Sequence, residues 1–325
     1  MTRTDPQTEN PAIGHKNKHR YEGNASLQPL KDAPATPQSR VAVAAFIAIA
    51  AGVLLALVWD PNFVDKVIGE GIAHLFLGGV DVAGTGWLGV TAVATVTGLA
   101  GTFTACNVAC FASLGPLAAA ERGGRPSRWA LVKRAAGQLG TLAVGQMIIA
   151  ALYGAIVVLS AHSLPMLNDQ TTTGLPPRLA QASIINTVLG IGLVIVAARY
   201  LAGRALRPGR TGLLIFGALL GLLQVGRPYP MFRDLLEQAA ESGNIPGASG
   251  LMILVVIGNI LLLSIVFLGL IAAAGPALQR LTTQRPRLVL TISGALLLAL
   301  GIFSIAYWAL RIPARFGIGW WFPNT

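Results

Sequence analysis

The chain has 325 residues, of which 54% are hydrophobic and only 11% are charged, and its net charge is +11. Soluble domains have roughly a quarter of their residues charged, so a soluble chain this poor in charge would expose large apolar patches to water. The composition excludes a soluble protein and indicates an integral membrane protein whose solvent is the lipid bilayer. The basic residues lie in short clusters between apolar stretches, as in membrane proteins, which argues against nucleic acid as a partner.

The first 40 residues are polar and contain scattered prolines, a composition that predicts a disordered tail. The first apolar stretch begins only at Val41. A cleaved secretory signal would place its apolar region much nearer the start, so no such signal is expected.

Seven later segments are apolar enough to cross a membrane, which takes roughly 20 mostly apolar residues in a helix. We therefore expect an all-α polytopic membrane protein with about seven transmembrane helices. The expected spans are residues 41–59, 87–120, 135–160, 184–201, 211–226 with a continuation, 250–274 and 288–310.

Two of these spans are interrupted. The second contains Gly115-Pro116, and the fifth runs into Gly226-Arg227-Pro228-Tyr229-Pro230. Proline lacks a backbone N–H and clashes with the preceding turn, so both helices are expected to kink or unwind at these points.

The connections between the apolar segments alternate in basic charge. From the N-terminal tail to the C-terminal tail they hold six, one, five, one, four, two, three and two Lys or Arg residues. Because Lys and Arg are enriched in cytoplasmic connections, this alternation predicts a cytoplasmic N-terminus and an external C-terminus. Residues 60–86 have apolar side chains at helical spacing with charges between them, which favours an amphipathic helix on the outer face over another span.

The sequence also contains a weak internal repeat. A shift of 120 residues aligns Gly101 with Gly221, and Gly145-Gln146 matches Gly258-Asn259 at a slightly different shift. Each half then holds three spans, an odd number, so the two copies would have opposite orientations in the membrane. A chance alignment of Ala- and Gly-rich helices is the alternative. In inverted repeats with broken helices, the site usually lies at the repeat interface near the midplane.

These predictions together divide the chain into a disordered tail, an extra span, an amphipathic segment, two inverted three-helix repeats and a C-terminal tail. Their boundaries are residues 1–40, 41–59, 60–86, 87–201, 211–310 and 311–325.

The only two cysteines, Cys106 and Cys110, lie in the first interrupted span. Four residues apart, they share one face of a helix, a geometry that favours a shared partner over a mutual disulfide unless the turn is distorted. Their position at a predicted break favours a functional role over plain packing. Thiol–disulfide exchange is preferred to a soft metal, because no nearby His or acidic residue completes a metal site; neither a metal nor another cofactor is expected.

Other residues at the two breaks are candidates for supporting the site. Asn107, between the cysteines, could hydrogen-bond across helices. Arg227 is an ionisable residue beside an apolar run, either part of a functional site or an interfacial arginine reaching the membrane surface. The remaining candidates are Gly115, Pro116, Gly226, Pro228, Tyr229 and Pro230.

These features, over residues 87–310, resemble the transmembrane electron relay of the CcdA/DsbD family (cytochrome c biogenesis protein, transmembrane region). The resemblance implies a three-plus-three inverted repeat with one cysteine per half. It also implies transfer of reducing equivalents across a bacterial plasma membrane, from a cytoplasmic thioredoxin-like donor to an extracytoplasmic thiol protein. Cys106 stands where the first family cysteine is expected, but Ala105 and Ala109 replace its flanking prolines.

The second half departs from the family. Gly226 occupies the position of the second cysteine under the 120-residue shift, so Cys110 or a partner's thiol would have to serve in its place. Two other functions remain open: a transporter of a small solute or metal ion that uses the same cavity, and a non-catalytic membrane subunit that docks through Trp320-Trp321-Phe322.

Overall fold

The computed structural model describes residues 38–60, 71, 75, 86–101, 128–160, 163–168, 174–204, 210–227 and 230–321. Their regular structure is entirely helical. The α-helices are α2 (Gln38–Val58), α4 (Trp87–Ala100), α6 (Arg128–Ser160), α7 (Pro177–Leu201), α8 (Arg210–Val225), α9 (Pro230–Glu241), α10 (Ile245–Gln284), α11 (Pro286–Ile305) and α12 (Ile312–Arg315). A 3₁₀ turn, η5 (Pro165–Leu167), precedes α7, and a π-helical turn, η6 (Ala306–Arg311), joins α11 to α12.

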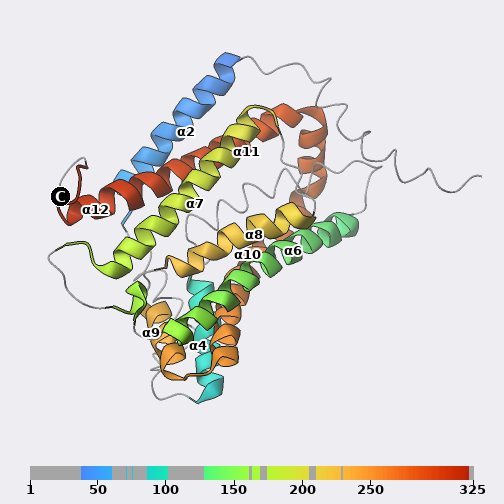
Figure 1. Ribbon diagram of the computed structural model, residues 1–325. Coiled ribbons are helices and arrows are strands. Elements are labelled where there is room, and N and C mark those ends of the chain that lie inside the picture. The colour runs from blue at the N-terminus through green and yellow to red at the C-terminus, as the bar shows by residue number, and fades with distance from the viewer. Residues whose placement is uncertain are drawn as a thin grey trace, which may run out of the picture.

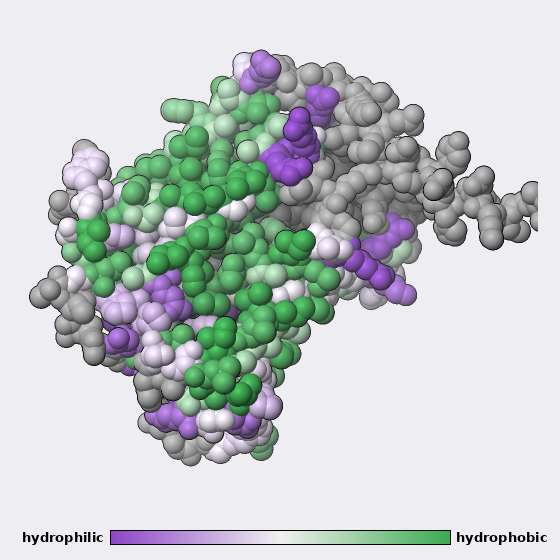
Figure 2. All heavy atoms as spheres, viewed as in Figure 1, coloured by the Kyte–Doolittle hydropathy of each residue, from purple (hydrophilic) through white to green (hydrophobic). Residues whose placement is uncertain are grey.

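Five helical segments are long and apolar enough to cross a membrane: Gln38–Val58, Trp129–Ser160, Pro177–Leu201, Ile245–Ala274 and Arg287–Arg315. Their outward faces carry exposed apolar side chains such as Phe46 and Leu159, each 73% exposed, which would be unfavourable in water. Hydrophobic residues cover most of the described part of the face in Figure 2, and hydrophilic groups gather mainly toward its edges. The chain thus has the surface of a membrane protein.

The expected count of seven spans is met in part. All seven apolar segments contain helix, but α4 and the apolar part of α8 (Arg210–Leu222) are shorter than the other five. The remainder of the expected second span, including Gly115-Pro116, lies outside the described residues.

Helix α6 and helix α10 form the central pair of the bundle (Figure 1). Gly154 of α6 lies against Ala248 of α10, and Leu139 of α6 clusters with Phe267 of α10, so the two helices run antiparallel. Helix α8 packs along α6 and helix α4 along α10. A second group consists of α7, α11 and α2, with α11 between the other two.

Glycines set the closest of these contacts. A Cβ at Gly98 of α4 would overlap the backbone of Val255 in α10, and one at Gly258 would overlap that of Thr95 in α4. Helices α6 and α8 make the same kind of contact. There, a Cβ at Gly145 would meet the carbonyl of Leu214, and one at Gly217 that of Leu142. Small residues let membrane helices approach closely, which is how these pairs gain van der Waals contact.

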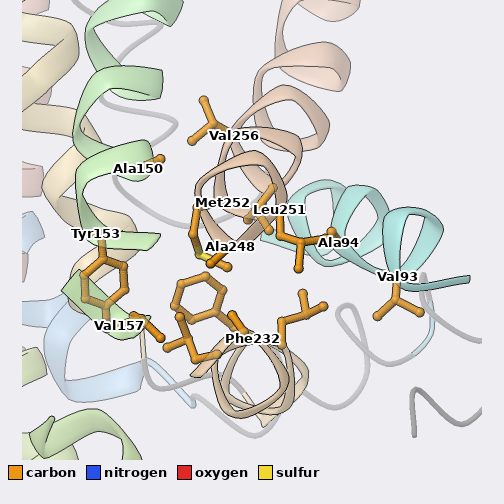
Figure 3. Close-up of a cluster of buried hydrophobic side chains, with 14 of the residues drawn as sticks. Val93, Ala94, Ala150, Tyr153, Val157, Phe232, Ala248, Leu251, Met252 and Val256 are labelled. Carbon is orange, nitrogen blue, oxygen red and sulfur yellow. The ribbon is translucent and has the colours of Figure 1, made fainter. Parts of the chain in front are cut away.

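Helix α9 is amphipathic and closes one end of the bundle. Its Phe232, Leu235 and Leu236 are fully buried in an apolar cluster built from α4, α6 and α10. Figure 3 shows the Phe232 ring between Ala248 and Met252 of α10 and Val157 of α6. The expected continuation of the fifth span after the break is this short amphipathic helix.

Several helices begin before the apolar segments that predicted them. Helix α6 starts at Arg128 rather than residue 135, α7 at Pro177 rather than 184, and α10 at Ile245 rather than 250. Hydropathy marks the part of a helix that lies in lipid, and a helix can continue beyond the hydrocarbon with polar residues. The same applies to α2, which starts at Gln38, inside the expected tail. Residues 1–37 and most of the expected amphipathic segment lie outside the described residues.

Candidate functional site

The second predicted break is present in the structure. Helix α8 ends at Val225, followed by Gly226 and Arg227, and α9 begins at Pro230. The last carbonyls of a helix have no partner within it. Here two amide side chains of α7 supply donors: Gln181 Nε2 donates to the Val225 carbonyl at 2.8 Å, and Asn186 Nδ2 to the Gly226 carbonyl at 3.3 Å. The break is held by specific hydrogen bonds from a neighbouring helix.

Gly226 is buried, and there is little room beside it for a side chain. A Cβ at this position would lie 3.0 Å from Ile185 Cγ2 and 3.2 Å from Asn186 Nδ2. Position 226 is therefore crowded by α7, and Asn186, one of the residues that crowd it, also holds the break.

Arg227, the next residue, reaches across to the end of α4. A Cβ at Gly101, the C-cap of α4, would overlap the Arg227 guanidinium. The guanidinium is partly buried and lies near the C-terminal ends of two helices, α4 and α8. These ends carry partial negative charge, so a cation between them is favoured. We call this contact between Gly101 and Arg227, together with Gly226, the junction.

Buried polar residues extend from the junction into the bundle. Gln146 and Asn259 are 3% and 5% exposed, and each directly follows one of the glycines in the close contacts, Gly145 and Gly258. Buried neighbours of both along the helices, Ala143 on α6 and Val256 on α10, belong to the same apolar cluster. Other buried polar side chains are Thr97, Ser183, Asn186, Gln224, Ser293 and Ser304. Some of them link helices: Asn186 donates to the Gly226 carbonyl, and the Ser304 hydroxyl donates to the Asn186 carbonyl, the kind of polar contact that joins helices within a membrane bundle.

The structure brings together two of the predicted site residues, Gly226 and Arg227, and adds Gly101 to them. Pro230 is the first residue of α9, where proline is tolerated because the N–H it lacks would be unpaired anyway. The remaining predicted residues lie outside the described part of the chain: Cys106, Asn107, Cys110, Gly115, Pro116, Pro228 and Tyr229.

Gln181 and Asn186 are site residues that the sequence did not single out. The signal available in the sequence was their position. Both are amides in the first half of a mostly apolar helix, where burying a polar side chain is unfavourable unless it forms a hydrogen bond. Chemically, the junction offers a fixed guanidinium that can stabilise an anion, such as a thiolate or a carboxylate. Among the described residues, no group of three His, Cys, Asp or Glu side chains could hold a metal ion. No protein-family model, characterised protein or solved structure matches the chain.

Proposed function

We propose that the chain is an inverted-repeat membrane protein, with α4, α6 and α7 as one copy and α8, α10 and α11 as the other. Exchanging each helix with its counterpart maps the most extensive helix contacts onto one another. The contact of α4 with α10 becomes that of α8 with α6, while the central pair α6–α10 and the outer pair α7–α11 map onto themselves. Helix α2 has no counterpart and packs on α11, as an added helix would.

The glycine contacts support the same pairing at the level of residues. In both crossings, each glycine meets the carbonyl three residues before the opposite glycine, which pairs Gly98 with Gly217 and Gly145 with Gly258. In the outer pair, a Cβ at Gly190 would lie 2.9 Å from the Gly301 carbonyl oxygen, and one at Gly301 would lie 2.9 Å from that of Gly190. A pseudo-two-fold axis between these two glycines accounts for this reciprocity.

We propose that the function is a thiol–disulfide relay of the CcdA/DsbD type, with Cys106 and Cys110 as its redox pair. The contact between Gly101 and Arg227 is the observation that carries this proposal, because it joins the end of α4, five residues before Cys106, to the break after α8. Cys106 follows Gly101 by five residues, and an extended chain spans at most about 3.6 Å per residue, so its backbone stays within ~18 Å of Gly101. A guanidinium near a cysteine stabilises the thiolate, which is the reactive form in exchange.

In this relay, a cytoplasmic thioredoxin-like dithiol would reduce a Cys106–Cys110 disulfide. The dithiol would lose two electrons and two protons and become a disulfide itself. The reduced pair would then pass two electrons and two protons to a disulfide on an extracytoplasmic thiol protein, and Cys106 and Cys110 would form their disulfide again. The charge alternation of the connections supports a cytoplasmic N-terminus and an external C-terminus in a bacterial plasma membrane.

Thiol trapping tests this proposal. Membranes are treated with a maleimide reagent that adds mass to each free thiol, before and after exposure to reduced thioredoxin, and Cys106→Ser and Cys110→Ser variants identify the bands. The relay predicts an oxidised population that thioredoxin converts to two free thiols. Cysteines that stay reduced under oxidising and reducing conditions alike would exclude it.

A transporter of a small solute is the second candidate, and the glycine at position 226 favours it. The second half has Gly226 where the resemblance expects a thiol, and a side chain there would meet Ile185 and Asn186 closely, while the bundle interior contains buried polar atoms that could face a solute. A Cys106→Ser variant separates the two functions. Loss of uptake or efflux of one solute, with the thiol balance of the cell unchanged, would favour transport.

A further inference from the structure

Four exposed arginines lie at one end of the helix group formed by α2, α7 and α11. They are Arg40 in the first turn of α2, Arg199 and Arg204 at and after the end of α7, and Arg285 at the start of α11. We call this set the arginine end. Within the described chain, their guanidinium groups have no hydrogen bond and no ion pair.

Contacts between α7 and α11 bring the end of one helix to the start of the other. Gly190 of α7 lies against Gly301 of α11, and Gly294 lies against Leu201, the last residue of α7. The two helices are therefore antiparallel. Arg199 and Arg204 accordingly lie at the end of the group where α11 begins.

Helix α2 adds its own start to the same end. Gly52 of α2 lies against the carbonyl of Ala299, and further along both helices Arg311 donates to the carbonyl of Ala56. The two helices therefore run parallel, and Arg40 lies at the end where α11 begins.

A tight turn holds Arg199 and Arg204 next to each other. The Arg204 N–H donates to the Arg199 carbonyl at 2.9 Å, and the Gly203 N–H donates to the Tyr200 carbonyl at 2.9 Å. With Gly203 at a φ of +72°, this is the Schellman ending of a helix. The turn fixes two like charges side by side, an arrangement that an anion between them would stabilise.

The described chain provides no such anion at this end. Its acidic residues lie after the end of α2 or on α9, at the opposite end of the bundle: Asp60, Asp234, Glu237 and Glu241. The counter-charge for the arginine end must therefore come from outside the described chain.

The arginines also lie where the apolar sides of the helices end. Each of the three helices has an exposed apolar side chain about one turn from its arginine: Val43, Ile195 and Leu288, which are 58%, 57% and 40% exposed. Figure 2 shows hydrophilic groups at this end, next to the hydrophobic surface of the helix sides. In a bilayer, the boundary between apolar and charged surface lies at the level of the lipid headgroups.

We propose that the arginine end binds the phosphate of an anionic phospholipid whose acyl chains lie along the apolar sides of α2, α7 and α11. Arginine is suited to this ligand, because its planar guanidinium can donate two parallel hydrogen bonds to phosphate oxygens. In the proposed orientation this end faces the cytoplasmic leaflet, where anionic lipids attract basic segments near the membrane surface. The inference goes beyond the relay and does not depend on it.

Lipid binding to the purified full-length chain tests this proposal. Native mass spectrometry from a neutral detergent measures the affinity for the first bound phosphatidylglycerol, which is anionic, and for phosphatidylcholine with the same acyl chains, which has no net charge. We expect phosphatidylglycerol to bind at least about tenfold more tightly, since each arginine near an anionic headgroup raises the affinity roughly fivefold. Equal affinities for the two lipids would overturn the proposal.

Matched substitutions locate the preference on the molecule. Arg204→Gln should lower the preference for phosphatidylglycerol roughly fivefold. Arg315→Gln removes the same charge from another exposed arginine, at the opposite end of the helix group, and should leave the preference unchanged. Equal losses in the two variants would show that net charge alone attracts the lipid, and the proposal would fail.

A second variant covers the case in which Arg204→Gln does not fold. Arg285 makes no side-chain capping bond, so Arg285→Gln should fold and should also lower the preference roughly fivefold. An unchanged preference in this variant would contradict the proposal. Inorganic phosphate, added at the concentration of phosphatidylglycerol, should not displace the lipid; displacement would show that the arginines bind a free anion instead. These measurements do not involve the cysteines, so failure here leaves the relay proposal standing.

Discussion

The guanidinium of Arg227 occupies the space that a side chain at position 101 would need. This relationship joins the end of α4 to the segment that follows α8, and it exists only because position 101 is a glycine. The end of α4, which precedes the two cysteines in the chain, is thereby connected to the break after α8.

Replacing Gly101 with alanine should displace the Arg227 guanidinium and disturb the junction. If the junction serves the relay, we expect the rate of cysteine reduction by thioredoxin to fall roughly ten- to hundredfold, since small misplacements at a reacting centre have effects of this size. Trapping time courses on membranes measure this rate. Gly137→Ala on α6 is the control, because a Cβ there has no neighbour within 4 Å. Equal rates in both variants would show that the contact has no functional role.

The two glycine crossings should respond alike to substitution. Gly98→Ala and Gly217→Ala each place a methyl group against the backbone of the facing helix, and overpacking of this kind typically costs about 1–3 kcal/mol. Thermal unfolding in detergent should show similar losses for the two variants. Gly140→Ala, with open space around it, should be neutral or slightly stabilising. A large loss in one half and none in the other would argue against an inverted repeat.

Introducing a thiol at position 226 should not create a redox pair with Cys106. Gly226→Cys brings a side chain to 3.0 Å from Ile185 Cγ2, so we expect the variant to be destabilised by about 1–3 kcal/mol. We also expect no disulfide between the new cysteine and Cys106, which gel mobility without a reductant would reveal. Ile185→Ala in the same chain should recover part of the lost stability by making room. A stable Gly226→Cys variant with a disulfide would contradict the crowding of position 226 by α7.

Arg311 should hold the added helix α2 in place. Its Nη1 donates to the carbonyls of Ala56 and Trp59 at 2.6 and 2.8 Å, which caps the C-terminal end of α2, and its guanidinium lies 5.5 Å from the Tyr307 ring centroid. Hydrogen bonds to charged groups contribute about 1.5–3 kcal/mol each, so Arg311→Gln should lower thermal stability and make the end of α2 sensitive to protease. Arg315→Gln, one turn later and exposed, is the control. Matching behaviour of both variants would mean that Arg311 does not anchor α2.

Hydropathy predicted where the helices lie but not where they begin or how they pair. Helix starts such as Arg128 and Pro177 fall in polar sequence, because a helix extends past the lipid without any change in backbone geometry. The break at Gly226 was predictable, since proline chemistry acts locally. The contacts that define the site were not, because Asn186 and Arg227 reach partners on other helices, and sequence spacing carries no information about such distances.

The repeat shows the same limit. Gly145 and Gly258 stood out in the sequence as matched positions, yet Gly98 pairs with Gly217 at a shift of 119 residues, not 120. One residue of difference on a helix turns a side chain by about 100°, so an approximate alignment could suggest a repeat but could not predict which glycines make the helix contacts.

The redox response of Cys106 and Cys110 in sealed inside-out membrane vesicles tests the central proposal most directly. Thioredoxin, its reductase and NADPH are added to the exposed cytoplasmic face, and free thiols are counted by maleimide mass shift over time, in the unmodified chain and in the Arg227→Gln variant. The relay predicts that both thiols appear in the unmodified chain and appear more slowly in the variant. Cysteines that remain in one state, whatever is added, would contradict it.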